Sequence, residues 1–156
     1  MATVPEQRDL TFNTIQEVVA EAERLAAGEV RTTGNHSFAE ILNHLALSHD
    51  VASGRLTPPP PPFFMKLMRP IIRLFVFGNK PLKPGIKLPP AGESFFWPKA
   101  DDVESALTYL KESADHYRTT GPVEKHPFFG NVTREQADSL NCRHGALHLS
   151  FVHPVQ

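Results

Sequence analysis

The sequence has a single cysteine, Cys142, and it has no hydrophobic run long enough to cross a membrane. One cysteine cannot form an intramolecular disulfide, so the fold does not depend on an oxidising compartment. The first ten residues also lack the basic start and the apolar core of a secretory signal. Together these absences predict a cytoplasmic protein.

Neither sign of charge is in excess, since 16 basic and 17 acidic residues give a net charge of -1. This balance provides no general electrostatic footprint for a nucleic-acid backbone, and we expect no nucleic-acid partner. The hydrophobic content of 40% and the charged content of 21% are typical of a folded globular chain. A length of 156 residues suits one hydrophobic core, which predicts a single domain over residues 1–156.

Four stretches combine helical spacing of apolar residues with residues that commonly begin or end helices. Ser37 with Glu40, and Thr133 with Gln136, have the spacing of capping boxes, and Asp101 is the expected cap of the third helix. Pro154 is expected to end the fourth helix. The four predicted helices cover residues 11–28, 37–53, 101–121 and 133–153.

Residues 54–100, between the second and third helices, hold eleven of the fifteen prolines and therefore form an insertion. The insertion begins with a polyproline spacer, and a short helix that follows it is expected to end or kink at Pro70. Seven basic and no acidic residues lie between Arg55 and Lys87. The favoured interpretation is a packed crossover or lid with its charges in water, because one short segment with an internal proline is a poor membrane anchor.

Four amphipathic helices, one long crossover and no clear strand pattern predict an all-α fold. The expected architecture is a four-helix bundle with a Pro-rich crossover insertion between helices two and three. Facing helices of such bundles often build metal sites in the core, which directs attention to the eight histidines.

His144 and His148, in "RHGALHLSF", lie four residues apart on the apolar stripe of the fourth helix. At this spacing two imidazoles can converge on one cation from adjacent turns. A third ligand would have to come from another helix, and "ILNHLALSHD" offers His44 or His49. Periodicity favours His49, which is nearer the centre of its stripe. The alternative is that both histidines of the fourth helix are core residues held by hydrogen bonds.

Three segments, "RTTGNHSFAEILNHLALS", "HPFFGNVT" and "RHGALHLSF", together resemble the DinB/YfiT-like superfamily of metal-binding four-helix bundles. They are most similar to an uncharacterised, mainly bacterial branch of it, a domain of unknown function, and the resemblance spans nearly the whole chain. By position, the resemblance implies that His44, His144 and His148 are the metal ligands, with His49 as the fallback. The metal implied is divalent, most often zinc or nickel.

Superfamily relatives with assigned activities are transferases or isomerases that use a low-molecular-weight thiol, and some are hydrolases. The resemblance thus implies a metal-dependent enzyme acting on a small-molecule substrate. The second function class is a non-catalytic metal-binding or structural bundle, which could pair as a homodimer through exposed helix faces. Candidate proton carriers for an enzyme are His49, Tyr117, His126 and Glu40.

Aromatic residues outside the four helices are expected to pack rather than to react. Phe128 and Phe129 would plug one end of the bundle, and Trp97 with its two neighbouring phenylalanines would bury the insertion or line a pocket mouth. His36 and His153 are expected to be solvated.

Overall fold

The computed structural model describes residues 5–156, so the first four residues of the predicted domain lie outside the described residues. Over the described range the chain is largely helical, as predicted. The helices are α1 (Ile15–Ala26), α2 (Phe38–Ala52), α3 (Phe63–Val76), α4 (Pro90–Phe96), α5 (Val103–Thr120) and α6 (Arg134–Leu149). The strands are β1 (Val30–Thr32), β2 (Lys125–His126), β3 (Gly130–Asn131) and β4 (Val152–Pro154).

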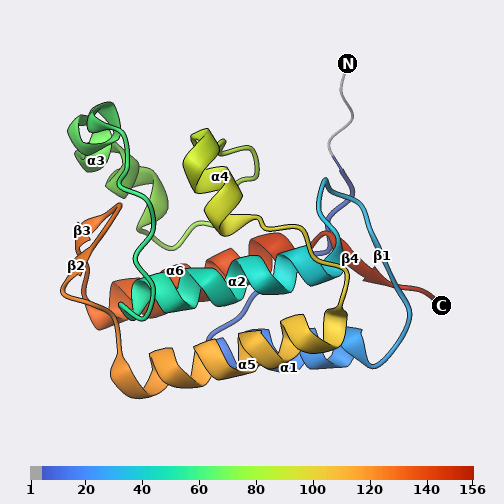
Figure 1. Cartoon of the computed structure of the whole chain (residues 1–156). Coiled ribbons are helices and arrows are strands. Elements are labelled where there is room, and N and C mark those ends of the chain that lie inside the picture. Colours follow the sequence, from blue (N-terminus) through green and yellow to red (C-terminus); the bar gives the residue numbers. More distant parts are fainter. Residues whose placement is uncertain (1–4) are drawn as a thin grey trace.

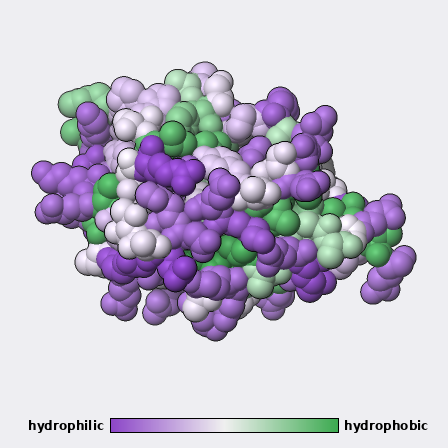
Figure 2. Space-filling model, turned by 60° about the horizontal axis from the view of Figure 1, so that its bottom comes forward, coloured by the Kyte–Doolittle hydropathy of each residue, from purple (hydrophilic) through white to green (hydrophobic). Residues whose placement is uncertain are grey.

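The four long helices α1, α2, α5 and α6 pack around a common core. Both α1 and α2 contact α5 and α6, and Figure 1 shows α2 and α6 in one layer above α1 and α5. The outer face of the α1–α5 layer is largely hydrophilic (Figure 2). The largest apolar side chains of the core are almost fully buried: Leu25, Leu42, Leu45, Leu110 and Leu149.

Helix α2 is the most buried helix, with 12 of its 15 residues buried. Its apolar residues face all directions because α5, α6 and α4 all contact it. Four of its buried residues are nevertheless polar: Glu40, His44, His49 and Asp50. Buried polar groups are costly unless they are paired, so α2 is where a functional role is to be sought.

Two short antiparallel pairs of strands accompany the helices, although the sequence shows no clear strand pattern. β1 pairs with β4, and β2 pairs with β3 in a hairpin between α5 and α6. Arg8 reinforces the first pair, because its guanidinium donates to the carbonyls of Leu149 and Val152 and forms an ion pair with Glu21. The N-terminal segment is thereby tied to the end of α6.

The ends of the helices agree only partly with the predicted caps. Thr133 and Gln136 form the predicted capping box of α6. Ser37 caps α2, but the Glu40 carboxylate does not return the bond, because it lies near His36 and Lys99. Helix α6 ends at Leu149 rather than at Pro154, since the chain turns there into β4.

The cap of α5 is Asp102 and not Asp101 as predicted, because the Asp102 carboxylate accepts from the backbone N–H of Ser105. Replacing Asp102 by alanine is expected to lower the melting temperature by about 3 °C, since the first turn loses its cap. Asp101→Ala is the matched control and should leave the melting temperature unchanged in a thermal unfolding scan. Equal effects of the two variants would contradict this assignment.

The insertion forms two further helices, α3 and α4, on the side of α2 and α6 that faces away from α1 and α5 (Figure 1). The prediction was that Pro70 ends or kinks this helix. Helix α3 continues through Pro70 to Val76, so the proline does not end it. Helix α4 was not predicted. Because α4 contacts α2, the insertion lies directly over part of the core.

Candidate metal centre

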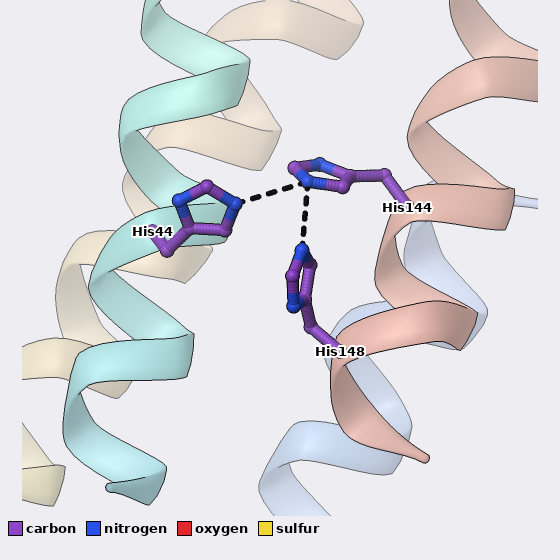
Figure 3. Close-up of side chains that lie close together, drawn as sticks. All are labelled: His44, His144 and His148. Carbon is purple, nitrogen blue, oxygen red and sulfur yellow. Dashed lines mark hydrogen bonds between the residues drawn. The ribbon is translucent and has the colours of Figure 1, made fainter. Parts of the chain in front are cut away.

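Three imidazoles meet between α2 and α6. Figure 3 shows His44 of α2 pointing toward His144 and His148 of α6, with the three rings turned toward one another. The Nε2 atom of His144 is 3.0 Å from Nε2 of His44 and 3.1 Å from Nε2 of His148. The structure therefore brings together the three histidines that the family resemblance implied, rather than the set with His49 that periodicity favoured.

Hydrogen bonding among the three rings cannot satisfy all of their nitrogens. Nδ1 of His44 lies 2.9 Å from the carbonyl oxygen of Phe96, so Nδ1 carries the proton and Nε2 of neutral His44 has a lone pair. His144 must then donate from its Nε2 to His44. The same Nε2 has no lone pair left for His148, so one of the two close contacts lacks a proper hydrogen bond.

The donor set suits a divalent cation. Zinc binds imidazole nitrogen at 2.0–2.1 Å, so two nitrogens of a tetrahedral site are separated by about 3.3 Å. The two short Nε2–Nε2 distances, 3.0 and 3.1 Å, are close to that separation. The donor atoms of all three histidines lie within 4.8 Å of one another. A cation among the three rings would accept a lone pair from each Nε2 atom, so no hydrogen bond between the rings would be needed.

Burial keeps all three rings in the neutral form that binds metals. It lowers the pKa of His144 to about 4, because the charged imidazolium would lose its hydration. Burial and the neighbouring His144 lower the pKa of His44 and of His148 well below the usual range of histidine. As whole residues, His44 is buried, whereas His144 and His148 are of intermediate exposure.

Trp97, at the end of α4, covers the cluster. Its indole lies parallel to the His44 ring at a centroid distance of 3.7 Å and parallel to the His36 ring at 3.6 Å. Its edge also meets the His148 ring at 5.2 Å. The stacking of Trp97 on His44 and the hydrogen bond to the Phe96 carbonyl together fix the orientation of the His44 ring. The expectation that His36 is solvated holds only in part, because one face of its ring is stacked on the indole while 29% of its side chain is exposed.

His49 lies outside the cluster. It is buried beside Tyr117 of α5, with 6.2 Å between the two ring centroids, and its Nδ1 has no hydrogen-bond partner among the described residues. Periodicity identified His49 correctly as a buried residue. It favoured the wrong histidine for the cluster because α2 is buried on nearly all sides, so no single stripe marks the side that faces α6.

Acid is expected to destabilise the protein in part through His49. Complete burial lowers the pKa of His49 to about 3, whereas in an unfolded chain it would be about 6.5. Between these values the unfolded state binds more protons than the folded state, so the free energy of unfolding falls as the pH falls. Above about pH 6.5 His49 does not lower the free energy of unfolding. Below about pH 6.5 it lowers this free energy by up to about 1.4 kcal/mol for each pH unit.

Urea unfolding of the His49→Leu variant between about pH 7 and pH 5 measures this effect. The free energy of unfolding of the variant should fall less steeply with acid than that of the unchanged protein. The other buried histidines remain as they are in both proteins. Identical slopes would show that His49 does not contribute.

The other candidate proton carriers do not hydrogen-bond to the cluster among the described residues. The Tyr117 hydroxyl donates to Asp138, and Nδ1 of His126 accepts from the backbone of Phe128 in the β2–β3 hairpin. Glu40 is one helical turn before His44, and its Oε2 has no hydrogen-bond partner in the described part of the chain. Of the four candidates, Glu40 and His49 thus share α2 with His44.

Four other residues considered in the sequence pack against other parts of the chain: Phe128, Phe129, His153 and Cys142. Phe128 and Phe129 pack against the insertion, near Phe96 and Phe77 respectively. His153 is buried rather than solvated. Cys142 is buried in the core, and burial raises the pKa of its thiol to about 11, so it is a packing residue.

Residues 4–155 match the protein family described as Protein of unknown function (DUF1569). No curated protein and no solved structure matches the chain. The match confirms the prediction of a domain of unknown function, while the wider resemblance to DinB/YfiT-like proteins stays a prediction. Since the match covers almost every residue of the chain, the protein belongs to the DUF1569 family.

Proposed function

We propose that His44, His144 and His148 bind one divalent metal ion, zinc or nickel, through their Nε2 atoms. The observation that carries this proposal is the convergence of three neutral imidazoles on one point, with a lone-pair conflict that a cation would resolve. The tautomer of His44 supports it, because the bond from Nδ1 to the Phe96 carbonyl leaves Nε2 free as a donor to metal.

Three protein ligands are typical of a catalytic zinc site, whereas a structural zinc site normally has four. When bound, the ion would supply a nucleophile at neutral pH by lowering the pKa of a water or of a thiol that occupies an open position. We infer an enzyme that acts on a small-molecule substrate, either a thiol-dependent transferase or isomerase, or a hydrolase. Such a substrate would have to reach the site from the α6 side, where His144 and His148 are of intermediate exposure.

The residues around the cluster would position the ligands and exclude water. The Phe96 carbonyl holds the His44 ring by accepting from Nδ1, and Trp97 covers the His44 ring and the edge of His148. Both come from α4 and the residue after it, so the insertion at residues 54–100 would form one wall of the substrate site. We infer that α1, α2, α5 and α6 form a single DinB-like four-helix bundle domain, and that the insertion is an addition to this bundle that covers its metal site.

Metal titration of the metal-free protein tests the proposal. We expect about one zinc or nickel ion per chain, with an X-ray absorption spectrum that shows imidazole nitrogen ligands at 2.0–2.1 Å for zinc. Trp97 is the only tryptophan of the chain, and its contact with His44 should allow nickel to quench its emission. A protein that binds neither metal, with unchanged emission, would refute the site.

The same preparation separates an enzyme from a structural bundle. In an enzyme the metal site should retain a position open to an added thiol, and removal of the metal by a chelator should leave the chain folded. A closed site whose metal removal unfolds the chain, as followed by circular dichroism, would favour the non-catalytic alternative.

A further inference from the structure

Helix α3 turns its apolar face to solvent. Apolar side chains recur along one side of it at helical spacing, and two of them, Leu74 and Phe75, are 80% and 82% exposed. Figure 2 shows hydrophobic atoms at the upper left of the surface, the side on which Figure 1 places α3. The face comprises Phe63, Phe64, Leu67, Ile71, Leu74 and Phe75.

The polar side of α3 makes the contacts within the chain. The Arg69 guanidinium donates to the Phe128 carbonyl, and the Arg73 guanidinium donates to the carbonyls of Phe129 and Asn131. Arg143 of α6 donates to the carbonyl of Val76, the last residue of α3. An amphipathic helix that packs on its own core has the opposite orientation. The expectation of a packed crossover is therefore wrong for the apolar side of α3, which is exposed, and for Arg69 and Arg73, which contact the hairpin, whereas the lysines do face water. The contacts hold the apolar face outward.

The chain segment that carries this face has charges of one sign. No acidic residue lies between Arg55 and Lys87. Four lysines of this stretch are exposed and form no ion pair among the described residues: Lys66, Lys80, Lys83 and Lys87. A second copy docked through the same face would bring like charges together, whereas an anionic partner would neutralise them.

No helix in the described part of the chain has the length and apolar content needed to cross a bilayer. A helix with aromatic and leucine residues on one side, and basic residues around it, instead lies in the plane of the membrane interface. Pro70 does not prevent this, because α3 continues through it. We propose that α3 docks on an anionic lipid bilayer, with its apolar face in the headgroup and acyl boundary and the four lysines at the lipid phosphates.

Vesicle sedimentation tests this proposal. The full chain should pellet with vesicles of equal parts phosphatidylcholine and phosphatidylglycerol, and much less with phosphatidylcholine alone. Leu74→Ser combined with Phe75→Ser should lower binding by about 100-fold, since both side chains lose their burial in lipid. Val155→Ser, at an exposed apolar residue of the C-terminal segment, is the matched control and should bind as the unchanged protein does.

Charge is tested separately. Replacing Lys80, Lys83 and Lys87 by glutamine should lower binding by about fivefold per lysine, with Lys111→Gln on α5 as the control. Circular dichroism should show every variant folded.

Several outcomes would overturn the proposal. These are the absence of pelleting with anionic vesicles, binding that the Leu74→Ser and Phe75→Ser pair leaves intact, and equal loss in Val155→Ser. A dimer that this pair dissociates, in a protein that does not pellet, would assign the face to a second copy of the chain.

Discussion

The His148→Ala variant is expected to bind zinc at least about 100-fold more weakly than the unchanged protein. The substitution removes one of three Nε2 donors that lie close together. Loss of a group that merely orients a ligand typically costs 10–100-fold in metal affinity, so loss of a ligand should cost more. The fold should survive, because His148 is partly exposed and the apolar residues of α6 remain in the core. Competition with a chromogenic chelator measures the affinity.

Two further variants make this result specific. His116→Ala is the matched control, since His116 lies on α5, outside the cluster, and this variant should keep full affinity. His49→Leu examines the fallback ligand and should also keep its metal. Metal retained by His148→Ala would contradict the three-histidine site, and metal lost only in His49→Leu would identify His49 as the ligand instead.

The Gly145→Leu variant is expected to lose about 3 kcal/mol of unfolding free energy, or about 10 °C in melting temperature. Gly145 is buried where α6 passes α1, and a Cβ atom there would lie 2.6 and 2.8 Å from the two methyl groups of Val18. Leucine gains nearly 1 kcal/mol in helix propensity over glycine, so a net loss would have to come from this clash. Because His144 is the adjacent residue, displacement of α6 should also weaken metal binding.

Urea unfolding followed by circular dichroism gives the free energy. Gly28→Leu is the matched control, because a Cβ atom at Gly28 would meet nothing within 4 Å. The control should change the free energy of unfolding by less than about 0.5 kcal/mol. A Gly145→Leu variant as stable as the control would mean that α1 and α6 are not in close contact at this point.

Local sequence rules predicted the long helices and some of their ends. Thr133 and Gln136 were identified correctly because a capping box needs only residues within one turn. Asp101 was chosen in place of Asp102 because two adjacent aspartates satisfy the same rule, and only the backbone decides between them. The strand pairs were missed because β1 and β4 have three residues each, too few to show an alternating pattern.

The sequence predicted the three clustered histidines but not the contact of Trp97 with them. His144 and His148 follow from spacing on one helix, whereas the choice of His44 over His49 came from the resemblance and not from periodicity. Trp97 was singled out only as an aromatic residue, with no partner assigned. Its contact with His44 joins residues 53 positions apart in the chain and depends on how the insertion packs on α2. No local pattern reports such a contact.

The hydrogen bonds from Arg8 to the carbonyls of Leu149 and Val152 join the N-terminal segment to the end of α6, and this has a consequence for synthesis on the ribosome. Helix α6, which carries two of the three clustered histidines, follows all the other helices in the sequence, and Arg8 binds the carbonyl of its last residue. During translation α2 therefore emerges long before α6, and the side of α2 that carries His44 stays uncovered until α6 follows. The nascent chain would hold an incomplete core until α6 and β4 have left the exit tunnel, and for that interval its exposed apolar surface is prone to aggregation.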